Sequence, residues 1–510
     1  MSEKKQKQIP KPGFVDRFLL NVEKAGNALP HPATLFALFA LMTVLLSWVA
    51  HQIGFEAVHP ATGEIIKPVN LLTHDGIHRM ILDMVNNYTS FAPLGIVMVA
   101  MLGIGIAESS GLIATAIRLL VITAPTRLIT FVLVFAGVLS NTASDIGYVL
   151  LIPLAGIIFI TIGRHPLVGM AAAFAGVSGG FSANLLLGTV DPLLAGLSEE
   201  AAHIIDATYS VNPTANYYFM AVSTFVIAIV GTWVTEKIVA PRFGNWQGPR
   251  EHEAIEKLTR KEKRGLLFAT IAGLAILVVT VAGVIHENGF FRGPDGTILS
   301  SPLIKGVVAM LFVSAGITGV AYGIGAGKFK SDKDVVHGMS EAMKSLGLYL
   351  VLVFFAAQFV AYFKWTNLGI IVAVEGATLL KASGLGVIPL MILFIILSAA
   401  INMMMGSASA KWALMAPVFI PMFMLLGYTP ELTQVVYRIG DSITNVISPM
   451  MSFFPLIIAF FQKYQKDAGI GTVIATMLPY SIAFFIAWTL MLILWLVMGW
   501  PLGPGAGTHL

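Results

Sequence analysis

Runs of about 20 apolar residues recur along almost the whole chain, and they constrain its fold more than any other feature. Only 11% of the 510 residues are charged, whereas about 25% is usual in a soluble protein. An apolar run of this length crosses the hydrocarbon core of a bilayer as an α-helix. The sequence therefore predicts an all-α polytopic membrane protein. We expect nine spans, at about 33–53, 90–107, 167–190, 216–236, 265–285, 305–327, 343–363, 430–461 and 472–498.

Basic residues cluster in segments that we assign to the cytoplasmic side. Six lysines and arginines precede residue 30, and eight more lie in the loop 237–264. Because cytoplasmic loops carry an excess of these residues, the N-terminus is predicted to be cytoplasmic and, after nine spans, the C-terminus periplasmic. The expected organisation is a cytoplasmic segment 1–32, a membrane half 33–236, a basic linker 237–264 and a second membrane half 265–510.

Two segments, 127–164 and 386–427, each contain two apolar arms around a polar tip. The tips cover residues 140–145 and 402–409, and a short helix precedes each hairpin, near 111–123 and 368–382. Polar non-helical backbone at membrane depth is tolerated only where it is buried in protein or lines a wet cavity. We therefore favour two re-entrant hairpins. Two ordinary spans with a polar kink are the alternative for the first of them.

An internal repeat connects the two halves. Five residues of the first half, Pro153, Gly163, Pro166, Gly176 and Ser178, recur 264 positions later as Pro417, Gly427, Pro430, Gly440 and Ser442. Asn141 matches Asn402 if about three residues are inserted in the second tip. In the predicted topology the two copies enter the membrane from opposite sides. Inverted repeats with interrupted helices are the usual plan of secondary transporters.

Side-chain oxygens gather at the hairpin tips and in the broken spans 167–190 and 430–461. Such oxygens, together with free backbone carbonyls, replace the hydration shell of Na⁺ in transporters of this plan. Capping of the broken helices is the alternative role for each Ser or Asn. The candidate Na⁺ ligands are Ser140, Asn141, Asp145, Ser178, Asn184, Asn402 and Asp441.

Arg438 and Asp441 are three residues apart, so on a helix they share a face. The guanidinium of Arg438 is suited to a substrate carboxylate, and Asp441 to a cation or a proton. A purely structural ion pair is the alternative. Trp412 offers a ring for stacking on an aromatic substrate, and packing is the equally weighted alternative.

Two further charged residues are ambiguous. Asp191 precedes Pro192, a pattern that also marks an ordinary helix N-terminus. Lys411 lies beside Trp412, and the sequence leaves three roles open for it. It can extend to the membrane surface, pair with an acid, or attract an anion.

Several function classes are excluded or disfavoured. The chain has no cysteine, which rules out disulfides and thiolate chemistry. It also lacks the GxxxxGK[ST] loop of ATP-driven systems and the HExxH motif of zinc hydrolases. An intramembrane enzyme would need a catalytic pair such as Asp145 with Asp441. We expect no enzyme activity, no nucleic-acid partner and no cofactor other than a coupling Na⁺ or H⁺.

Several longer motifs resemble one known family over nearly the full length. They are NALPHP at 27–32, GRHPLVGMAAAFAGVSGGFSANLL, PRFGNWQG, SAKWALMAPVFIPMFMLLGYTPE, YRIGDS, MLPY and WPLGPG at 500–505. The family is that of the p-aminobenzoyl-glutamate transporters. The resemblance implies an inner-membrane homodimer whose protomers have nine spans and two hairpins.

The resemblance also implies a function and a set of site residues. The implied function is cation-coupled transport, by import or efflux, of p-aminobenzoyl-glutamate, related folate-type aromatic carboxylates or sulfonamide antimetabolites. A Na⁺-coupled dicarboxylate transporter is the alternative. The family's functional positions fall on Asp191, Asn402, Ser409, Trp412, Pro430, Arg438, Asp441 and Pro449.

Overall fold

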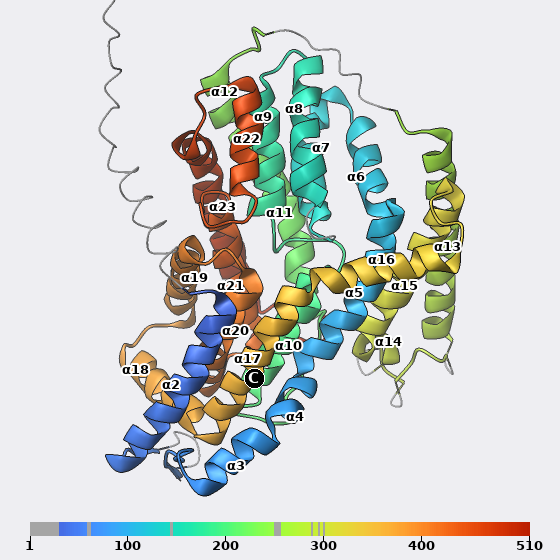
Figure 1. Ribbon diagram of the computed structural model, residues 1–510. Helices are drawn as coiled ribbons and strands as arrows, with labels where there is room; N and C mark the ends of the chain where they lie inside the picture. The colour runs from blue at the N-terminus through green and yellow to red at the C-terminus, as the bar shows by residue number, and fades with distance from the viewer. Residues whose placement is uncertain are drawn as a thin grey trace, which may run out of the picture.

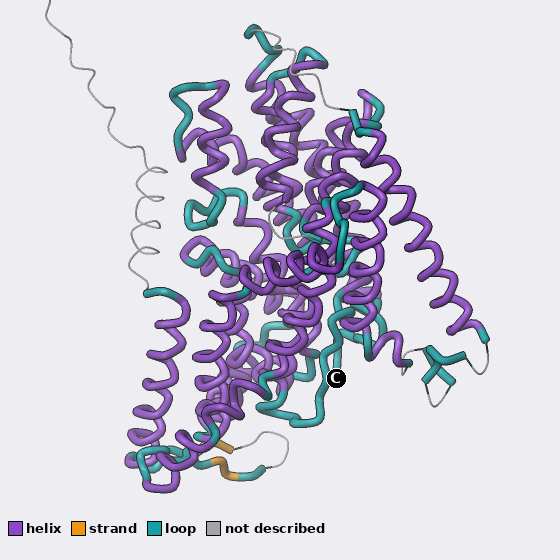
Figure 2. Tube along the Cα trace, turned by 45° about the vertical axis from the view of Figure 1, so that its right-hand side comes forward, coloured by secondary structure: helices purple, strands orange, loops and turns teal. Residues whose placement is uncertain are grey.

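The computed structural model describes residues 30–58, 63–142, 146–248, 257–286, 289–293, 296–298 and 301–510. Asp145 and residues 1–29 of the predicted cytoplasmic segment lie outside these ranges. Helices make up most of the described chain, and two short strands pair at one end (Figure 2). The elements of the first part are α2 (Pro32–Gln52), β1 (Ala57–Val58), β2 (Ile65–Ile66), α3 (His74–Leu82), α4 (Met84–Thr89), α5 (Ala92–Ser110), α6 (Leu112–Ile122), η1 (Thr126–Leu128), α7 (Ile129–Ser140), η2 (Gly147–Leu151), α8 (Ile152–Thr161), α9 (Pro166–Phe174), η3 (Ala175–Gly179), α10 (Val190–Ala202), α11 (Tyr217–Val234), η4 (Thr235–Val239) and α12 (Ala240–Phe243).

The second part repeats much of this order (Figure 1). Its elements are α13 (Arg260–Ile285), α14 (Pro302–Lys305), α15 (Val307–Ala326), α16 (Asp332–Ser345), α17 (Gly347–Trp365), α18 (Leu368–Ala382), α19 (Val387–Met404), α20 (Ala408–Leu425), α21 (Pro430–Asn445), α22 (Phe454–Tyr464) and α23 (Ile470–Met498).

Nine helices of the described ranges are long and apolar enough to cross a membrane. Seven coincide with predicted spans, and the other two are α19 and α20, the arms of the second hairpin. The predicted broken spans are divided as expected: α9 and η3 are followed by irregular backbone, and so is α21. The all-α multi-span architecture is confirmed, although the helices that pass this length test are a different nine from those predicted.

The second hairpin has a shorter tip than predicted. Helix α19 continues past Asn402 to Met404, and α20 begins at Ala408, which leaves only residues 405–407 between them. The Ser407 side chain accepts a hydrogen bond from the Ala410 amide and caps α20, the usual role of serine at a helix start. Asn402 and Ser409 therefore lie within helices rather than in a loop.

The first hairpin consists of α7 and the pair η2–α8. Ser140 is the last residue of α7, and Asn141 follows it as the C-cap. The chain bends by 110° between α6 and the segment that begins at Thr126. Pro125 lies in this bend, where it ends the helix before it because proline cannot continue one. The short helix predicted before the hairpin is thus confirmed.

Matching backbone features confirm the internal repeat. Gly163 and Gly427 both have positive φ, 76° and 89°, a conformation that glycine adopts without a steric penalty. Pro166 and Pro430 then each occupy the first position of a helix. The turn between α8 and α9 lies at the upper end of Figure 1, whereas the C-terminus, which contacts the second turn, lies in the lower half. The two copies are therefore inverted.

Close helix contacts repeat as well. A Cβ on Gly176 would be 2.2 Å from the Val134 carbonyl oxygen, and one on Gly440 would be 2.5 Å from that of Ile395. Val134 and Ile395 are 261 residues apart, the same separation as Asn141 and Asn402. Each broken helix thus packs its glycine directly on the backbone of the preceding hairpin.

A strap of extended chain holds each of the two turns. Arg164 pairs with Asn245 in an isolated β-bridge, and the equivalent residue, Tyr428, pairs with His509. The C-terminal strap makes further hydrogen bonds: Thr429 Oγ1 donates to the Gly507 carbonyl at 2.8 Å, and the Leu510 amide donates to the Gly427 carbonyl at 3.0 Å. The segment that follows the last helix of each repeat therefore anchors the start of the broken helix in that repeat.

We expect Gly440→Ala to destabilise the fold by about 1–3 kcal/mol, because its methyl group overlaps the Ile395 carbonyl and cores resist added volume. Gly347→Ala is the matched control, since a Cβ there meets nothing within 4 Å. Thermal unfolding in detergent, followed by size-exclusion of heated samples, measures the difference. Equal melting temperatures for the two variants would contradict this packing.

Helices α13 and α15 pack beside the first repeat, where α15 contacts α5 (Figure 1). A Cβ on Gly103 would be 2.5 Å from the backbone of Phe312, and one on Gly319 would be 2.7 Å from that of Ala107. Small residues at such crossings let membrane helices approach closely. The predicted boundaries between halves at 236 and 264 stay a prediction.

Candidate functional site

Helix α21 is the centre of the candidate site. Fifteen of its sixteen residues are buried, all except Thr444. The Thr429 side chain caps the helix by accepting from the Leu432 amide, and Pro430 occupies the first turn, where its missing N–H costs nothing. Polar residues follow one another at intervals of three or four along this helix: Glu431, Gln434, Arg438, Asp441 and Asn445. The fold therefore buries a polar stripe.

Two buried ion pairs lie along this stripe. Arg438 Nη2 donates to Asp191 Oδ1 at 2.7 Å, and Lys411 Nζ donates to Asp441 Oδ1. Lys411 is 0% exposed and Arg438 3%. The alternative of an ion pair between Arg438 and Asp441 is wrong: although both lie on α21, each is paired with a residue of another helix. Each pair thus joins α21 to a neighbour, α10 or α20.

Asp191 combines the two roles that the sequence left open. It lies in the first turn of α10, and its Oδ2 accepts from the Gly188 amide at 2.8 Å, while Oδ1 accepts from Arg438. The carboxylate also faces the positive end of the helix dipole. Asp191 therefore stabilises a helix start and neutralises a buried guanidinium at the same time.

Asn402 connects the second hairpin to α21. Its Nδ2 lies 2.7 Å from the Asp441 carbonyl and 2.8 Å from Asn445 Oδ1, and its Oδ1 accepts from Lys411 Nζ. The structure thus decides the role of Lys411 among the three alternatives: it pairs with an acid and an amide. Four residues, Asn402, Lys411, Asp441 and Asn445, form one connected cluster.

The first hairpin has a related arrangement, without charged side chains among its described tip residues. Asn141 Nδ2 lies 3.5 Å from the Gly180 carbonyl, and Asn184 Nδ2 donates to Thr142 Oγ1 at 3.1 Å. Ser140 donates to the Gly137 carbonyl of its own helix, and Ser178 lies 3.1 Å from the Met451 sulfur. Asn141 Oδ1 is buried and has no hydrogen-bond partner among the described residues. Cation binding here stays a prediction, and Asp145 lies outside the described residues.

The two broken segments meet at their interruptions. The Ser182 amide donates to Ser442 Oγ at 3.1 Å, and Arg438 Nη2 lies 3.2 Å from the Ser182 carbonyl. In the second segment, Ser448 Oγ donates to the Asn402 carbonyl at 3.2 Å. The site therefore contains backbone from both repeats, as expected for an inverted-repeat transporter.

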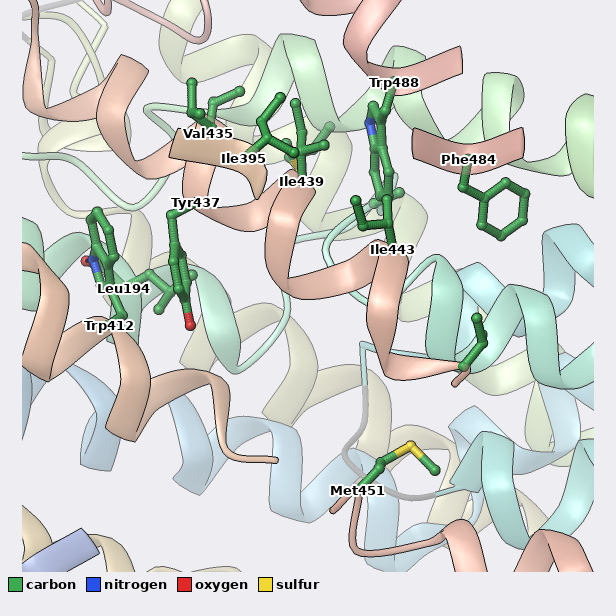
Figure 3. Close-up of a cluster of buried hydrophobic side chains, with 14 of the residues drawn as sticks. Leu194, Ile395, Trp412, Val435, Tyr437, Ile439, Ile443, Met451, Phe484 and Trp488 are labelled. Carbon is green, nitrogen blue, oxygen red and sulfur yellow. Dashed lines mark hydrogen bonds between the residues drawn. The ribbon is translucent and has the colours of Figure 1, made fainter. Parts of the chain in front are cut away.

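Trp412 lies on α20, where its side chain is fully buried against other parts of the protein. Its ring stacks on Tyr437 with centroids 4.4 Å apart (Figure 3), and its Nε1 donates to Ser198 Oγ at 3.0 Å. No part of the ring is exposed. Of the two roles left open by the sequence, the structure shows packing. Substrate stacking on this ring would require the site to open.

Three other predicted positions lie around the same helices. Pro430 begins α21, and Pro449 lies half-buried in the irregular segment before α22. Ser409, in the first turn of α20, lies with its Oγ 3.3 Å from Ser407 Oγ. Among the described residues, neither Ser409 nor Pro449 forms a hydrogen bond with either ion pair.

A buried hydrogen-bond network was not predicted. Ser198 Oγ donates to Gln434 Oε1 at 2.7 Å, Gln434 Nε2 donates to Asn216 Oδ1 at 2.8 Å, and Tyr209 donates to Glu431 Oε2 at 2.9 Å. It links α10 and the start of α11 to α21. The polar stripe on α21 is the sequence signal that could have revealed it, because its period of three to four matches one helix face.

A cavity of about 880 Å³ lies beside the first hairpin rather than at the charged residues. Its wall includes Thr142, the unwound residues Leu185 and Leu187, Tyr217, and Met310 of α15. The lining is almost entirely apolar. Leu187 directly precedes Gly188, whose amide binds Asp191. The cavity therefore approaches the Arg438–Asp191 pair from the side of the unwound segment.

Comparison with known proteins decides the family. The model of the AbgT transporter family matches residues 17–510. The chain belongs to the AbgT family. It is 38% identical to the p-aminobenzoyl-glutamate transport protein of Escherichia coli K12 over 485 residues, which is 95% of each chain. The predicted family is thus confirmed.

Two solved structures of AbgT-family transporters resemble the fold closely. The YdaH transporter of Alcanivorax borkumensis superimposes with a TM-score of 0.89 at 45% identity, and 93% of this chain covers all of it. MtrF of Neisseria gonorrhoeae, described as illuminating a class of antimetabolite efflux pumps, gives 0.91 at 49% identity, with 96% and 100% covered. This AbgT protein is therefore a multi-span membrane transporter, and its family favours transport over catalysis.

Proposed function

We propose that this AbgT transporter moves p-aminobenzoyl-glutamate, related aromatic carboxylates and sulfonamide antimetabolites across the bacterial inner membrane. The names of its relatives support this substrate class. One observation carries the proposal: a buried guanidinium, Arg438, lies where the two broken segments meet, and its Nε has no partner. A planar fork of this kind is suited to binding a carboxylate.

The proposal extends to coupling and to the site residues. The substrate-transport positions are Asp191, Asn402, Ser409, Trp412, Pro430, Arg438, Asp441 and Pro449. The driving ion is Na⁺ or H⁺. Asn141 in the first hairpin supports a cation role, because its buried side-chain oxygen is unpaired. The apolar cavity beside this hairpin is wide enough for an aromatic ring, which supports its use as the entry for the substrate.

Orientation and assembly are also proposals. We place the loop 237–264 and the N-terminus in the cytoplasm, the C-terminus in the periplasm, and two protomers in a homodimer. The eight basic residues of that loop support the orientation. Membrane lipid surrounds the assembly.

Transport into proteoliposomes tests the function. With an imposed Na⁺ or H⁺ gradient, we expect unmodified p-aminobenzoyl-glutamate to cross the membrane and accumulate on one side. A sulfonamide should compete, and succinate should not. Conversion of the substrate to products would indicate an enzyme instead, and inhibition by succinate would indicate a dicarboxylate transporter.

Arg438→Ala is expected to reduce this flux by roughly 30-fold or more, because losing one partner of a buried charge pair costs about 2–5 kcal/mol. Lys344→Ala is the matched control: Lys344 is exposed on α16 and pairs only with Glu341 on the same helix. Its flux should equal that of the unmodified protein. Full flux in Arg438→Ala would show that the substrate binds elsewhere.

A further inference from the structure

Both buried ion pairs of α21 are incompletely satisfied. Arg438 reaches Asp191 through Nη2 alone. Within the described part of the chain, Arg438 Nε has no hydrogen-bond partner; Asp441 uses Oδ1 for Lys411, and its Oδ2 has none. Buried charged groups normally have all their hydrogen bonds satisfied. The unpaired nitrogen and the unpaired oxygen belong to neighbouring residues of one helix face. The site therefore has unused capacity for a ligand that carries charge.

The fold itself does not require these charges. At the positions 264 residues earlier, the first repeat has Gly147 for Lys411, Phe174 for Arg438 and Val177 for Asp441. These residues are buried in the same kind of hairpin and broken helix. Because the first repeat folds with uncharged residues at these three positions, the charges of Lys411, Arg438 and Asp441 point to binding.

We propose that the two carboxylates of the substrate displace two aspartates when the substrate binds: Asp441 from Lys411, and Asp191 from Arg438. The proposal rests on the proposed function and identifies Lys411 as a further substrate-binding residue. p-Aminobenzoyl-glutamate carries two carboxylates on its glutamate portion. One replaces Asp441 on the Lys411 ammonium, and the other replaces Asp191 on the Arg438 guanidinium. The resting transporter thus neutralises its own binding groups.

Charge balance couples this exchange to uptake of a cation. Before exchange the two cationic side chains face two carboxylates, so the site is neutral. After exchange the substrate supplies both negative charges, and the displaced aspartates remain buried. A buried carboxylate is unstable without a compensating charge, so each displaced aspartate acquires one coupling cation, Na⁺ or H⁺. Substrate binding therefore takes up as many as two cations.

Few other ionisable groups surround these aspartates. Helix α21 packs against α10, α19, α20, α23 and η3. Helix α19 and η3 contain no ionisable residue, α20 contains only Lys411, and α23 only Tyr480, which bonds to Thr235. On α21 itself, Tyr437 and Arg438 lie near Asp441. The remaining acids of α10 are engaged elsewhere: Glu199 accepts from the Val211 amide, and Glu200 accepts from that of Ala92.

The dependence of binding on Na⁺ concentration and on pH tests cation uptake. We expect purified protein to bind p-aminobenzoyl-glutamate about tenfold more tightly for each tenfold rise in the coupling cation and each cation taken up. Asp441→Asn removes the competing charge, so this variant should bind more tightly than the unmodified protein at low cation concentration and lose one cation from the slope. It should also accumulate less substrate on a gradient of that cation, because one of the coupled cations is lost. Lys344→Ala should keep both the affinity and the slope.

The outcomes separate the two proposals. No binding to the unmodified protein at any pH would overturn the proposed function. Binding with the same slope and no gain in affinity in Asp441→Asn would overturn carboxylate exchange alone. Asp191→Asn repeats the test for the second pair, and size-exclusion in detergent confirms that each variant is folded.

A cycle between Lys411 and the substrate tests the assigned contact. Lys411→Met is made in the Asp441→Asn background, so that no buried charge is left uncompensated. The probes are p-aminobenzoyl-glutamate and its two monoamides, in which one carboxylate is converted to a neutral amide. We expect Lys411→Met to weaken binding of the diacid and of one monoamide by at least tenfold, and of the other monoamide by less than twofold. An equal loss for all three ligands would overturn the contact.

Discussion

Lys411→Met is expected to destabilise the protein by about 3–5 kcal/mol, the usual cost of removing one partner of a buried ion pair. Lys411 and Asp441 are 0% and 1% exposed in their side chains. Without the ammonium, the carboxylate of Asp441 is left buried with no opposing charge, and Asn402 Oδ1 also loses its donor. Thermal unfolding in detergent across several pH values measures the loss.

A second substitution provides the control for this prediction. Lys411→Met combined with Asp441→Asn removes both charges, so most of the lost stability should return. This recovery distinguishes an uncompensated charge from a simple packing defect. If the double variant is less stable than Lys411→Met alone, the pair contributes through its shape and not through its charge.

Trp412→Ala is expected to have the other large effect, a loss of about 3–5 kcal/mol of stability. The substitution leaves a cavity against Tyr437 and removes the donor to Ser198, which also belongs to the buried network that reaches Gln434. Thermal unfolding and proteoliposome flux should fall together, because α10, α20 and α21 lose a common contact.

Trp412→Phe separates packing from substrate recognition. Phenylalanine keeps a ring against Tyr437 (Figure 3) but loses the indole donor. We expect a loss of about 1–2 kcal/mol from the missing hydrogen bond to Ser198 and nearly unchanged affinity for p-aminobenzoyl-glutamate. A large drop in affinity with full stability would instead indicate that the indole contacts the substrate.

The repeat shows how much of the fold could be predicted. Glycines and prolines recur 264 residues apart because each performs a backbone task that other residues do poorly: Gly163 and Gly427 adopt positive φ, and Gly176 and Gly440 allow direct backbone contact. These tasks leave a mark in the sequence. The extent of the second tip was less predictable, because Asn402 and Ser409 lie within helices although their types suggest a loop.

The ion pairs show what could not be predicted. The spacing of Arg438 and Asp441 placed them correctly on one face of α21, yet it did not indicate the partner of either. Two residues on one helix face compete with every group that other helices bring to that face. Asp191 is 247 residues from Arg438 in the sequence, and no local pattern encodes that contact.

The sequence by itself determined the membrane class, the positions of the spans, the inverted repeat and the family of this AbgT transporter. The physical reason is that lipid offers no hydrogen bonds to the backbone, so apolar runs of sufficient length must become helices. Only the tertiary structure decided that Lys411 neutralises Asp441, that Asp191 neutralises Arg438, and that Trp412 packs on Tyr437. Buried charges take their partners from whichever helices the fold brings together, and that choice depends on the packing of the whole chain.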